Sequence, residues 1–196
     1  MQILLATGNP GKVKEFQNAL KPLGHEILSA QDFNLPEVEE TGQSFKDNAL
    51  IKARNAFAHT KRPSLADDSG LAVHALNCEP GVYSARWAGP EQNYNKAMRS
   101  IHEKLADKKD RSASFICVLC LISCENETPV FFEGRVEGKL TWPPRGEKGF
   151  GYDPFFIPDE SPDKTFAEMN VSDKQRISHR GRAIQKLTEY LEITKF

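Results

Sequence analysis

The sequence predicts one α/β domain in which helices surround a mixed β-sheet. Strand-like apolar runs and segments with helical spacing alternate along the chain, which is typical of this fold class. The 196 residues, 39% hydrophobic and 27% charged, suffice for one buried core and lie within the usual size of one domain. We find no internal repeat, low-complexity tract or break in composition. We therefore expect a single domain over residues 1–196.

The chain starts with a predicted strand, turn and helix. Residues 3–6 form an apolar run, and helical spacing follows over residues 13–23 until Gly24 ends it. A second helix is predicted for residues 44–60, because Ser44 and Asp47 are placed for a start that resembles a capping box.

The middle of the chain contains four predicted strands and a helix. Two short strands, residues 64–67 and 71–76, flank a predicted turn at the sequence DDSG. Residues 93–108 place apolar side chains on one helical face, and residues 112–124 and 129–141 read as longer strands.

The end of the chain is predicted to be a loop followed by a helix. Proline and glycine punctuate residues 142–158, which indicates a loop. Ser172 and Gln175 have the spacing of another capping box, which predicts the start of the last helix. Its core-facing stripe consists of Ile177, Ile184, Leu187 and Leu191.

Charge and hydropathy disfavour several classes of protein. The net charge is −1, with basic and acidic residues interspersed, so no basic face suits a nucleic-acid backbone. The first residues lack the basic and apolar regions of a signal peptide, and the longest nearly apolar run, residues 115–122, is too short to span a bilayer. We expect a soluble, cytoplasmic protein.

Three of the four cysteines lie close together in the sequence FICVLCLISC. If this run is a strand, as its composition indicates, Cys117 and Cys120 face opposite sides, and Cys124 lies about 13 Å from Cys120. A helix would instead gather all three on one face and allow a metal site. We favour the strand, with small buried thiols in a reducing compartment.

The turn TGNPGK at residues 7–12 is a candidate phosphate site. Gly8 and Gly11 permit close approach to the backbone, the following helix presents N-terminal amides, and Lys12 adds a positive charge. The spacing is not that of a Walker loop, which needs four residues between the glycines and a hydroxyl after the lysine. A plain strand-to-helix turn therefore explains this stretch as well as a phosphate site does.

Carboxylates stand in two places that could serve a metal. Asp67 and Asp68 lie in ADDSG at the end of a predicted strand, where active-site residues of α/β folds gather. Adjacent strand residues face opposite sides, so we expect only one of the two to enter a site. Glu39 and Glu40 lie in the predicted acidic loop 36–42, and one carboxylate from each segment would suffice for Mg²⁺. An aspartate-rich turn without a chemical role is the alternative.

Three further stretches carry groups suited to a nucleotide. Lys52 lies on the small, apolar side of its helix and either snorkels or points into a cleft. The loop GFGYDPFF, residues 149–156, joins flexible backbone to aromatic rings that suit a planar base, or is a turn before an apolar run. Lys174, His179 and Arg180 gather at a predicted helix start, either as a solvated face or as donors for an anion and a carbonyl.

Six sequence motifs, in order, resemble one known family. They are TGNPGK, EETG followed by FKDNALIKA, ADDSGL, PGVYSARW, GFGYDPFF and ISHRG, and they run over essentially the whole chain. Together they resemble the inosine/xanthosine triphosphate pyrophosphatase family, the Ham1-like house-cleaning enzymes. The resemblance implies a long mixed sheet whose helices make two lobes around a substrate cleft. It also implies a homodimer that uses Mg²⁺ to hydrolyse ITP, dITP or XTP to the monophosphate and pyrophosphate.

The resemblance implies roles for individual residues. Asp68 matches the residue assigned as general base and metal ligand, Glu40 matches a second metal ligand, and Ser69 matches a substrate contact. Lys52 matches a substrate-contacting lysine, so snorkelling is no longer favoured. The remaining substrate-binding positions are Thr7, Gly8, Asn9, Pro10, Gly11 and Lys12 for the triphosphate, and Phe150, Gly151, Tyr152, Asp153, Lys174, His179 and Arg180 for the base and nearby phosphate.

Two positions depart from the family pattern. Lys148 stands where many relatives have glycine, which would stiffen the base loop, and Trp87 stands where relatives often carry a smaller aromatic residue. Neither matches a position with an assigned chemical role.

The chemistry that these residues suggest is attack of water on the α-phosphorus. Asp68 would deprotonate the water beside Mg²⁺, and Lys12, Lys52 and the amides of the Gly8 turn would stabilise the leaving pyrophosphate. A non-catalytic nucleotide-binding sensor is the alternative function, and the two metal-binding acids argue against it.

Selection of the base would rest on hydrogen-bond donors. Amides of residues 150–153, together with His179 or Arg180, would donate to the 6-oxo group of the purine. Adenine would then present a donor to a donor, which disfavours ATP as a substrate.

Overall fold

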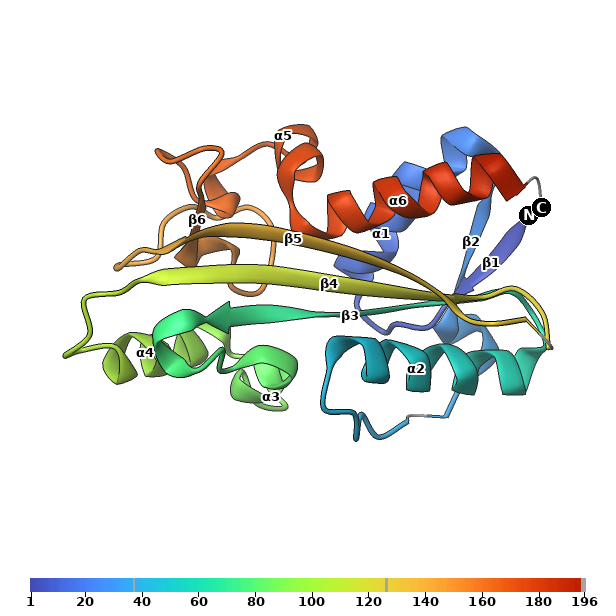
Figure 1. The fold of residues 1–196 in the computed structure, drawn as a ribbon, viewed down its shortest axis with the longest axis horizontal. Helices are drawn as coiled ribbons and strands as arrows, with labels where there is room; N and C mark the ends of the chain where they lie inside the picture. Colours follow the sequence, from blue (N-terminus) through green and yellow to red (C-terminus); the bar gives the residue numbers. More distant parts are fainter. Residues whose placement is uncertain (37, 126, 195–196) are drawn as a thin grey trace. The chain divides into compact units, whose positions relative to one another are not determined.

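The computed structural model describes residues 1–36, 38–125 and 127–194, so Glu37 of the predicted acidic loop lies outside it. Within these ranges six strands form one sheet with the order β2-β1-β3-β4-β5-β6 (Figure 1). Strand β1 pairs in parallel with β2 and β3, whereas β5 and β6 are antiparallel, so the predicted mixed sheet is confirmed. The strands are β1 (Gln2–Leu5), β2 (Glu26–Ser29), β3 (Ser64–Val73), β4 (Ser112–Ile122), β5 (Val130–Leu140) and β6 (Phe156–Pro158).

Helices flank the sheet, as the predicted α/β class requires. None of the helices in the described ranges is long and apolar enough to cross a membrane. The α-helices are α1 (Pro10–Leu20), α2 (Phe45–Thr60), α3 (Ser84–Trp87), α4 (Tyr94–Lys104), α5 (Val171–Ile177) and α6 (His179–Thr194).

The chain divides into two compact units. Unit one comprises Met1–Asp68, Cys117–Glu133 and the chain from Ala183 onward, and unit two comprises Ser69–Ile116 and Gly134–Arg182. Strands β3, β4 and β5 therefore contribute residues to both units, and the boundary in β3 falls between Asp68 and Ser69. The single domain and the substrate cleft that the sequence implied stay predictions.

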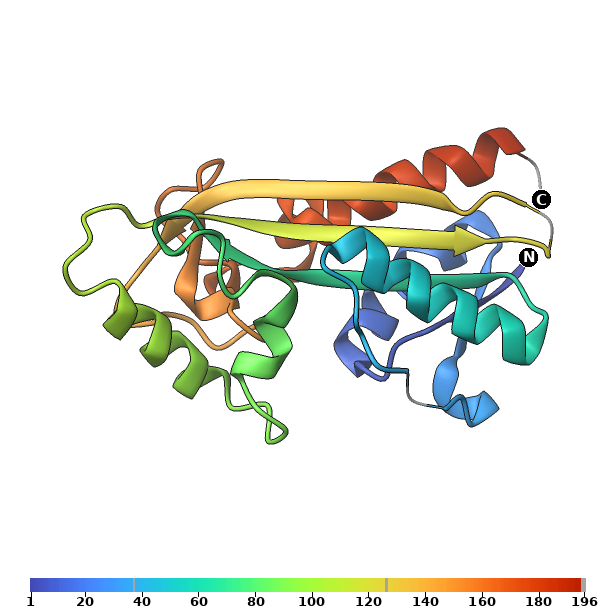
Figure 2. The same ribbon diagram turned by 60° about the horizontal axis from the view of Figure 1, so that its bottom comes forward.

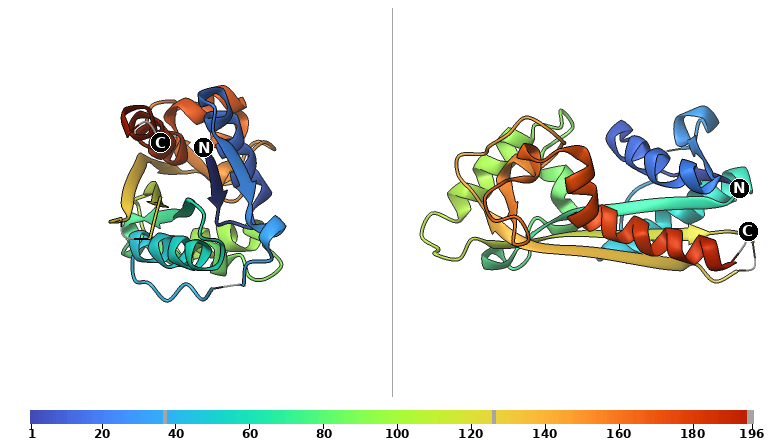
Figure 3. Two further views of the ribbon diagram at one scale, coloured as in Figure 1. Left: turned by 90° about the vertical axis from the view of Figure 1, so that its right-hand side faces the viewer. Right: turned by 90° about the horizontal axis from the view of Figure 1, so that it is seen from above.

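Unit one has helices on both faces of its strands. Helices α1 and α6 lie on one side and α2 on the other (Figures 1 and 3). Phe16 of α1 and Leu187 of α6 are completely buried in a core that includes Leu65 of β3 and Cys117 of β4. The helix α2 packs through small residues, of which Ala53 is fully buried. Its small side chains keep α2 close to the strands that carry the site.

Unit two has one covered and one open sheet face. Along β5, Val136 and Leu140 are buried in the unit-two core, while Arg135, Glu137 and Lys139 are exposed. This two-residue period is that of a strand with solvent on one side. Helices α3 and α4 lie together on one side of the strands (Figure 2). The core is aromatic and includes Phe115, Phe155, Phe156 and Phe166.

The predicted turn at DDSG is wrong, because β3 runs continuously from Ser64 to Val73. Aspartate and glycine favour turns locally, but here the whole segment is buried except at Ser69. A Cβ added at Gly70 would lie 2.4 Å from both the Gly81 carbonyl oxygen and Ser84 Oγ. This glycine therefore allows close packing of a neighbouring segment rather than a turn.

The predicted single C-terminal helix is also wrong, because it is divided into α5 and α6 at Ser178. Ser178 has an extended backbone, with ψ 158°. The predicted cap is displaced as well: Asn170 Oδ1 accepts from the Asp173 amide at 2.8 Å, so the helix begins before Ser172. Within the predicted stripe, Ile177 packs against the unit-two core and Leu187 belongs to that of unit one.

Other short elements departed from the sequence predictions. Strand β2 and helix α3 were not predicted, and β6 lies inside the predicted loop 142–158. All three have four residues or fewer, so their periodicity is too short to identify an element. By contrast, Ser44 caps α2 by accepting from the Asp47 amide at 3.1 Å, which confirms the predicted helix start.

The cysteines behave largely as the strand interpretation predicts. Cys117 and Cys120 are buried in β4, and none of the four cysteines, all of which lie in the described ranges, forms a disulfide. Cys124 lies beyond the end of β4 and is exposed, so the prediction of a buried thiol is wrong at that position. Burial raises the pKa of Cys120 to about 12, which keeps it a protonated, unreactive thiol.

Candidate active site

The turn at residues 7–12 is held by its own side chains. Asn9 is the N-cap of α1, and its Oδ1 accepts from the amides of Gly11 at 2.9 Å and Lys12 at 3.3 Å. The Asn9 amide in turn donates to Thr7 Oγ1 at 3.2 Å. The expectation that these helix amides are free for an anion is therefore wrong for Gly11 and Lys12. A Cβ added at Gly8 would meet no atom within 4 Å, so space remains beside the turn.

Lys12 leaves this turn to form an ion pair with Asp67. The Asp67 side chain has no exposed surface, and its second oxygen accepts a hydrogen bond from Cys117 Sγ at 3.3 Å. Asp67 therefore lies on the α1 side of β3, among the residues of the unit-one core.

Lys52 lies between two carboxylates on the opposite side of β3. Its Nζ is 2.7 Å from Asp68 Oδ1 and 2.7 Å from Glu40 Oε1, and the lysine side chain is only 15% exposed. Snorkelling is thereby excluded. Because adjacent β3 residues bind lysines on opposite faces, the predicted alternation of Asp67 and Asp68 is confirmed.

The loop that carries Glu40 is fixed to α2 by Asn48. This side chain is 1% exposed, and its Oδ1 accepts from the Gly42 amide at 2.8 Å. Sequence analysis missed Asn48, although a buried amide side chain in a helix interior needs a specific partner.

The charges of this cluster shift the pKa values of Asp68 and Lys52. Burial raises the pKa of Asp68 above its ordinary value, and attraction to Lys52 offsets this only in part. Burial alone would lower the pKa of Lys52, but the carboxylates of Asp68 and Glu40 outweigh it and raise that pKa. Lys52 thus stays protonated, and Asp68 is a stronger proton acceptor than an ordinary aspartate.

The residues present fit a magnesium ion with few protein ligands. Asp68 Oδ2 is buried and has no hydrogen-bond partner among the described residues, which suits an oxygen that binds a cation. Glu40 Oε1 and Asp68 Oδ1 share one lysine, so they lie within twice 2.7 Å of each other. No group of three or more histidine, cysteine, aspartate or glutamate residues in the described ranges could enclose a metal. A hydrated Mg²⁺, which often uses one or two carboxylates, fits this donor set.

In unit two, Asp153 organises the predicted base loop from inside. It is buried, and its Oδ2 accepts from the Phe150 amide at 2.8 Å and from Lys174 Nζ at 2.6 Å. Gly149 has φ +76°, and a Cβ there would lie 2.1 Å from the same oxygen. The Phe150 amide is thus engaged within the loop, so the expectation that it serves the base is wrong.

Two cations lie over the Phe150 ring. Lys174 Nζ is 5.0 Å and the Arg180 guanidinium carbon 5.5 Å from the ring centroid. Arg180 also donates to Ser69 Oγ at 2.8 Å, and His179 stacks on Phe115 with a centroid separation of 4.6 Å. Lys174 lies on α5, whereas His179 and Arg180 begin α6. Lys174 contacts the base loop, Arg180 contacts both this loop and β3, and His179 contacts β4.

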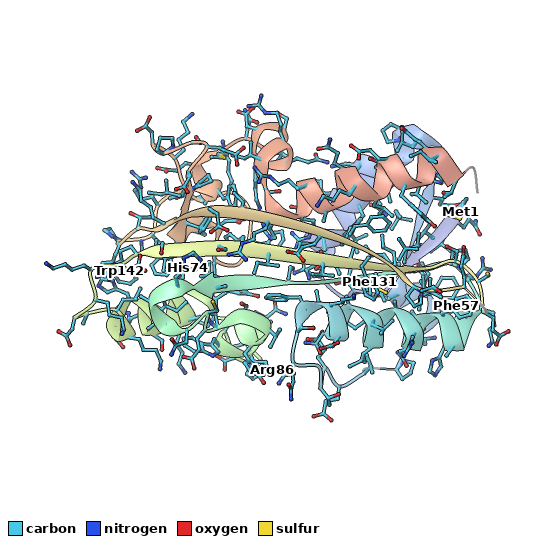
Figure 4. The ribbon with its side chains drawn as sticks, viewed as in Figure 1. Met1, Phe57, His74, Arg86, Phe131 and Trp142 are labelled. Carbon is cyan, nitrogen blue, oxygen red and sulfur yellow. The ribbon has the colours of Figure 1, made fainter. Side chains whose placement is uncertain are left out.

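Ser84 joins three of the sequence motifs and was missed by sequence analysis. Its Oγ accepts from the Leu71 amide at 2.9 Å and donates to the Gly81 carbonyl at 2.6 Å. Its carbonyl accepts from Tyr152 of the base loop at 2.8 Å. The motif PGVYSARW therefore supports the backbone next to Ser69, whereas its exposed Arg86 points away from the strands (Figure 4).

The predicted site residues thus form two groups. The phosphate group lies in unit one and the base group in unit two. Within unit one, Lys52 joins Glu40 and Asp68, and the turn at residues 7–12 reaches β3 through the pair of Lys12 with Asp67. The phosphate group consists of Thr7, Gly8, Asn9, Pro10, Gly11, Lys12, Glu40, Lys52 and Asp68. The base group consists of Ser69, Phe150, Gly151, Tyr152, Asp153, Lys174, His179 and Arg180.

Comparison with known proteins identifies the family. The model of the Ham1 family matches residues 3–190. This chain belongs to the Ham1 family. A dITP/XTP pyrophosphatase of Gluconobacter oxydans is 46% identical over 93% of this chain and 87% of its own length. One of Exiguobacterium is 47% identical over 95% of each chain.

Solved Ham1 structures share the fold. A Ham1 protein from Coxiella burnetii superposes with a TM-score of 0.91 at 42% identity and covers 98% of each chain. The Staphylococcus aureus Ham1 protein gives a TM-score of 0.88 at 36% identity, again over 98% of each. The family and the fold that the sequence motifs implied are both confirmed.

Proposed function

We propose that this Ham1 protein hydrolyses non-standard purine nucleoside triphosphates, namely dITP, XTP and ITP, to the monophosphate and pyrophosphate. The observation that carries the proposal is Asp68, a buried carboxylate whose pKa is raised and which is held by Lys52 beside Glu40. Relatives of nearly the same length that are named dITP/XTP pyrophosphatases support the choice of substrate.

In the proposed reaction Asp68 accepts a proton from the attacking water. The water oxygen bonds to the α-phosphorus, and the bond from that phosphorus to the bridging oxygen breaks, so pyrophosphate leaves. Lys12 and Lys52 stabilise the negative charge that develops on the leaving group. Mg²⁺, held by Glu40 and Asp68, would lower the pKa of the water and neutralise phosphate charge.

The base group is proposed to select the purine. Phe150 offers an aromatic face, and Arg180 and His179 offer donors to a 6-oxo group. An adenine 6-amino group would present a donor to these buried donors, a mismatch that can reduce kcat/KM by about 10⁴-fold. Because Phe150 donates its amide to Asp153, this discrimination rests on the side-chain donors and the remaining loop amides.

We also propose that the enzyme is a homodimer that acts on free nucleotides in the cytoplasm and binds no nucleic acid. The family resemblance supports the dimer, and the nearly balanced charge supports the absence of a polymer ligand. Light scattering would give the oligomeric state.

The test is pyrophosphate release from dITP, XTP, ITP, dATP and dGTP with Mg²⁺. The wild type should prefer the first three, and Asp68→Asn should lower kcat at least 100-fold. Glu125→Gln, which neutralises an exposed carboxylate paired with Lys61, is the matched control and should behave as the wild type. Turnover by Asp68→Asn within tenfold of the wild type would refute the role of Asp68. Tight dITP binding without turnover by the wild type would favour the nucleotide sensor.

A further inference from the structure

Asp67 occupies a position that the proposed reaction does not use. It is next to the proposed general base but lies on the other face of β3, where its fully buried carboxylate pairs with Lys12. Lys12 belongs to the phosphate turn. The cation proposed to receive the triphosphate therefore already has a buried counter-ion.

The pairing restricts what Lys12 can do. Separating the members of a buried ion pair is strongly unfavourable, so Lys12 stays in contact with Asp67 when a phosphate arrives. The Cys117 thiol, 3.3 Å from the other Asp67 oxygen, adds a weak hydrogen-bond donor. A phosphate at the turn therefore shares Lys12 with Asp67, and the attraction available to the phosphate is reduced.

We propose that Asp67 is a positioning residue that competes with pyrophosphate for Lys12 and thereby keeps the product from binding too tightly. The Asp67 carboxylate holds the Lys12 ammonium at the turn before the substrate binds. After the reaction, it attracts the same ammonium away from the bound pyrophosphate. The proposal rests on the proposed function, since pyrophosphate is the product only if the chain is a pyrophosphatase.

Asp67→Asn tests the proposal because it removes the charge and keeps the shape. The dissociation constant of pyrophosphate, measured by calorimetry with and without Mg²⁺, should fall roughly tenfold, since Lys12 then serves the phosphate alone. The KM for dITP should fall as well, and kcat should fall because product leaves more slowly. If Asp67 served only to stabilise the fold, its replacement would weaken pyrophosphate binding. Unchanged or weaker binding by a folded Asp67→Asn protein overturns the proposal.

Two further measurements complete the test. In a Lys12→Gln background, adding Asp67→Asn should change the pyrophosphate affinity less than twofold, because the effect passes through Lys12. A tenfold change there would mean direct repulsion and would overturn the positioning role. If Asp67→Asn does not fold, Cys117→Ala tests the same competition for Lys12 in the opposite direction. Without the thiol, Asp67 holds Lys12 more firmly, so pyrophosphate should bind about twofold to threefold more weakly, and tighter binding would contradict the proposal.

The controls separate this inference from the proposed function. Glu125→Gln should leave pyrophosphate affinity unchanged, because its pair with Lys61 is exposed to solvent. Failure of the wild type to hydrolyse dITP would refute the pyrophosphatase. Failure of Asp67→Asn to tighten pyrophosphate binding, in a wild type that does hydrolyse dITP, would refute only the competition for Lys12.

Discussion

Replacing Lys52 with methionine should move the acidic limb of the pH–rate profile to higher pH. Coulomb's law at an effective dielectric constant near 20 gives about 6 kcal/mol for the attraction of Asp68 across the 2.7 Å contact. The same ammonium contacts Glu40, which is 32% exposed, so solvent screening and relaxation of the site should reduce this attraction by about half. The remaining attraction is about 3 kcal/mol, which corresponds to about two pKa units. Activity requires ionised Asp68, whose pKa would rise, so kcat/KM should decline at a pH about two units higher than in the wild type.

The assay is the pH dependence of kcat/KM for dITP, which reports the free enzyme. Lys52→Arg keeps the charge and should leave the limb within about half a unit of the wild type. Lys61→Met, which removes a lysine from the exposed pair with Glu125, is the matched control. A Lys52→Met enzyme that is slow but has an unshifted limb would show that Lys52 serves the substrate and not the ionisation of Asp68.

Three further changes probe the support of the site. Gly149→Ala places a Cβ 2.1 Å from Asp153 Oδ2 at φ +76°, so it should cost about 1–3 kcal/mol of unfolding free energy in urea and reduce the preference for dITP over dATP. Tyr152→Phe removes the donor to the Ser84 carbonyl and should cost about 1 kcal/mol in the same assay. Ser44→Ala removes the cap of α2 and should cost about 1 kcal/mol in thermal unfolding, with KM unchanged.

Each of these expectations has a contrary outcome. A Gly149→Ala protein as stable as the wild type would mean that the base loop has another backbone conformation in solution. Full stability of Tyr152→Phe would mean that water replaces the phenol at the Ser84 carbonyl, and a Ser44→Ala protein that loses dITP affinity would implicate the cap directly in binding.

Local signals predicted the parts of the fold that local interactions determine. Ser44 caps α2 because its hydroxyl reaches an amide three residues ahead, and Asp67 and Asp68 face opposite sides because strands alternate. The predicted turn at DDSG is wrong because the local pattern does not include contacts with distant segments. At Gly70, β3 packs closely against Gly81 and Ser84, a contact between segments that no short pattern records.

The site shows the same limit. Motifs identified the lysines and acids, but not which charges pair. Lys12, Asp67 and Cys117 are far apart in the chain, so their contact follows from the order of the strands and not from spacing. Asn48 was overlooked because an asparagine in a helix is usually exposed, and only the fold shows it bound to the Gly42 amide.

The alternation of β3 has a consequence for how chain length can vary among Ham1 proteins. Deleting one residue before Asp67 would shift the register of β3 by one position. Asp68 would then stand beside Lys12 and Ser69 beside Lys52, so Lys52 would lose its carboxylate partner in β3. Insertions and deletions should therefore accumulate in the loops and be absent from β3. The positions of the gaps in an alignment of Ham1 sequences can verify this.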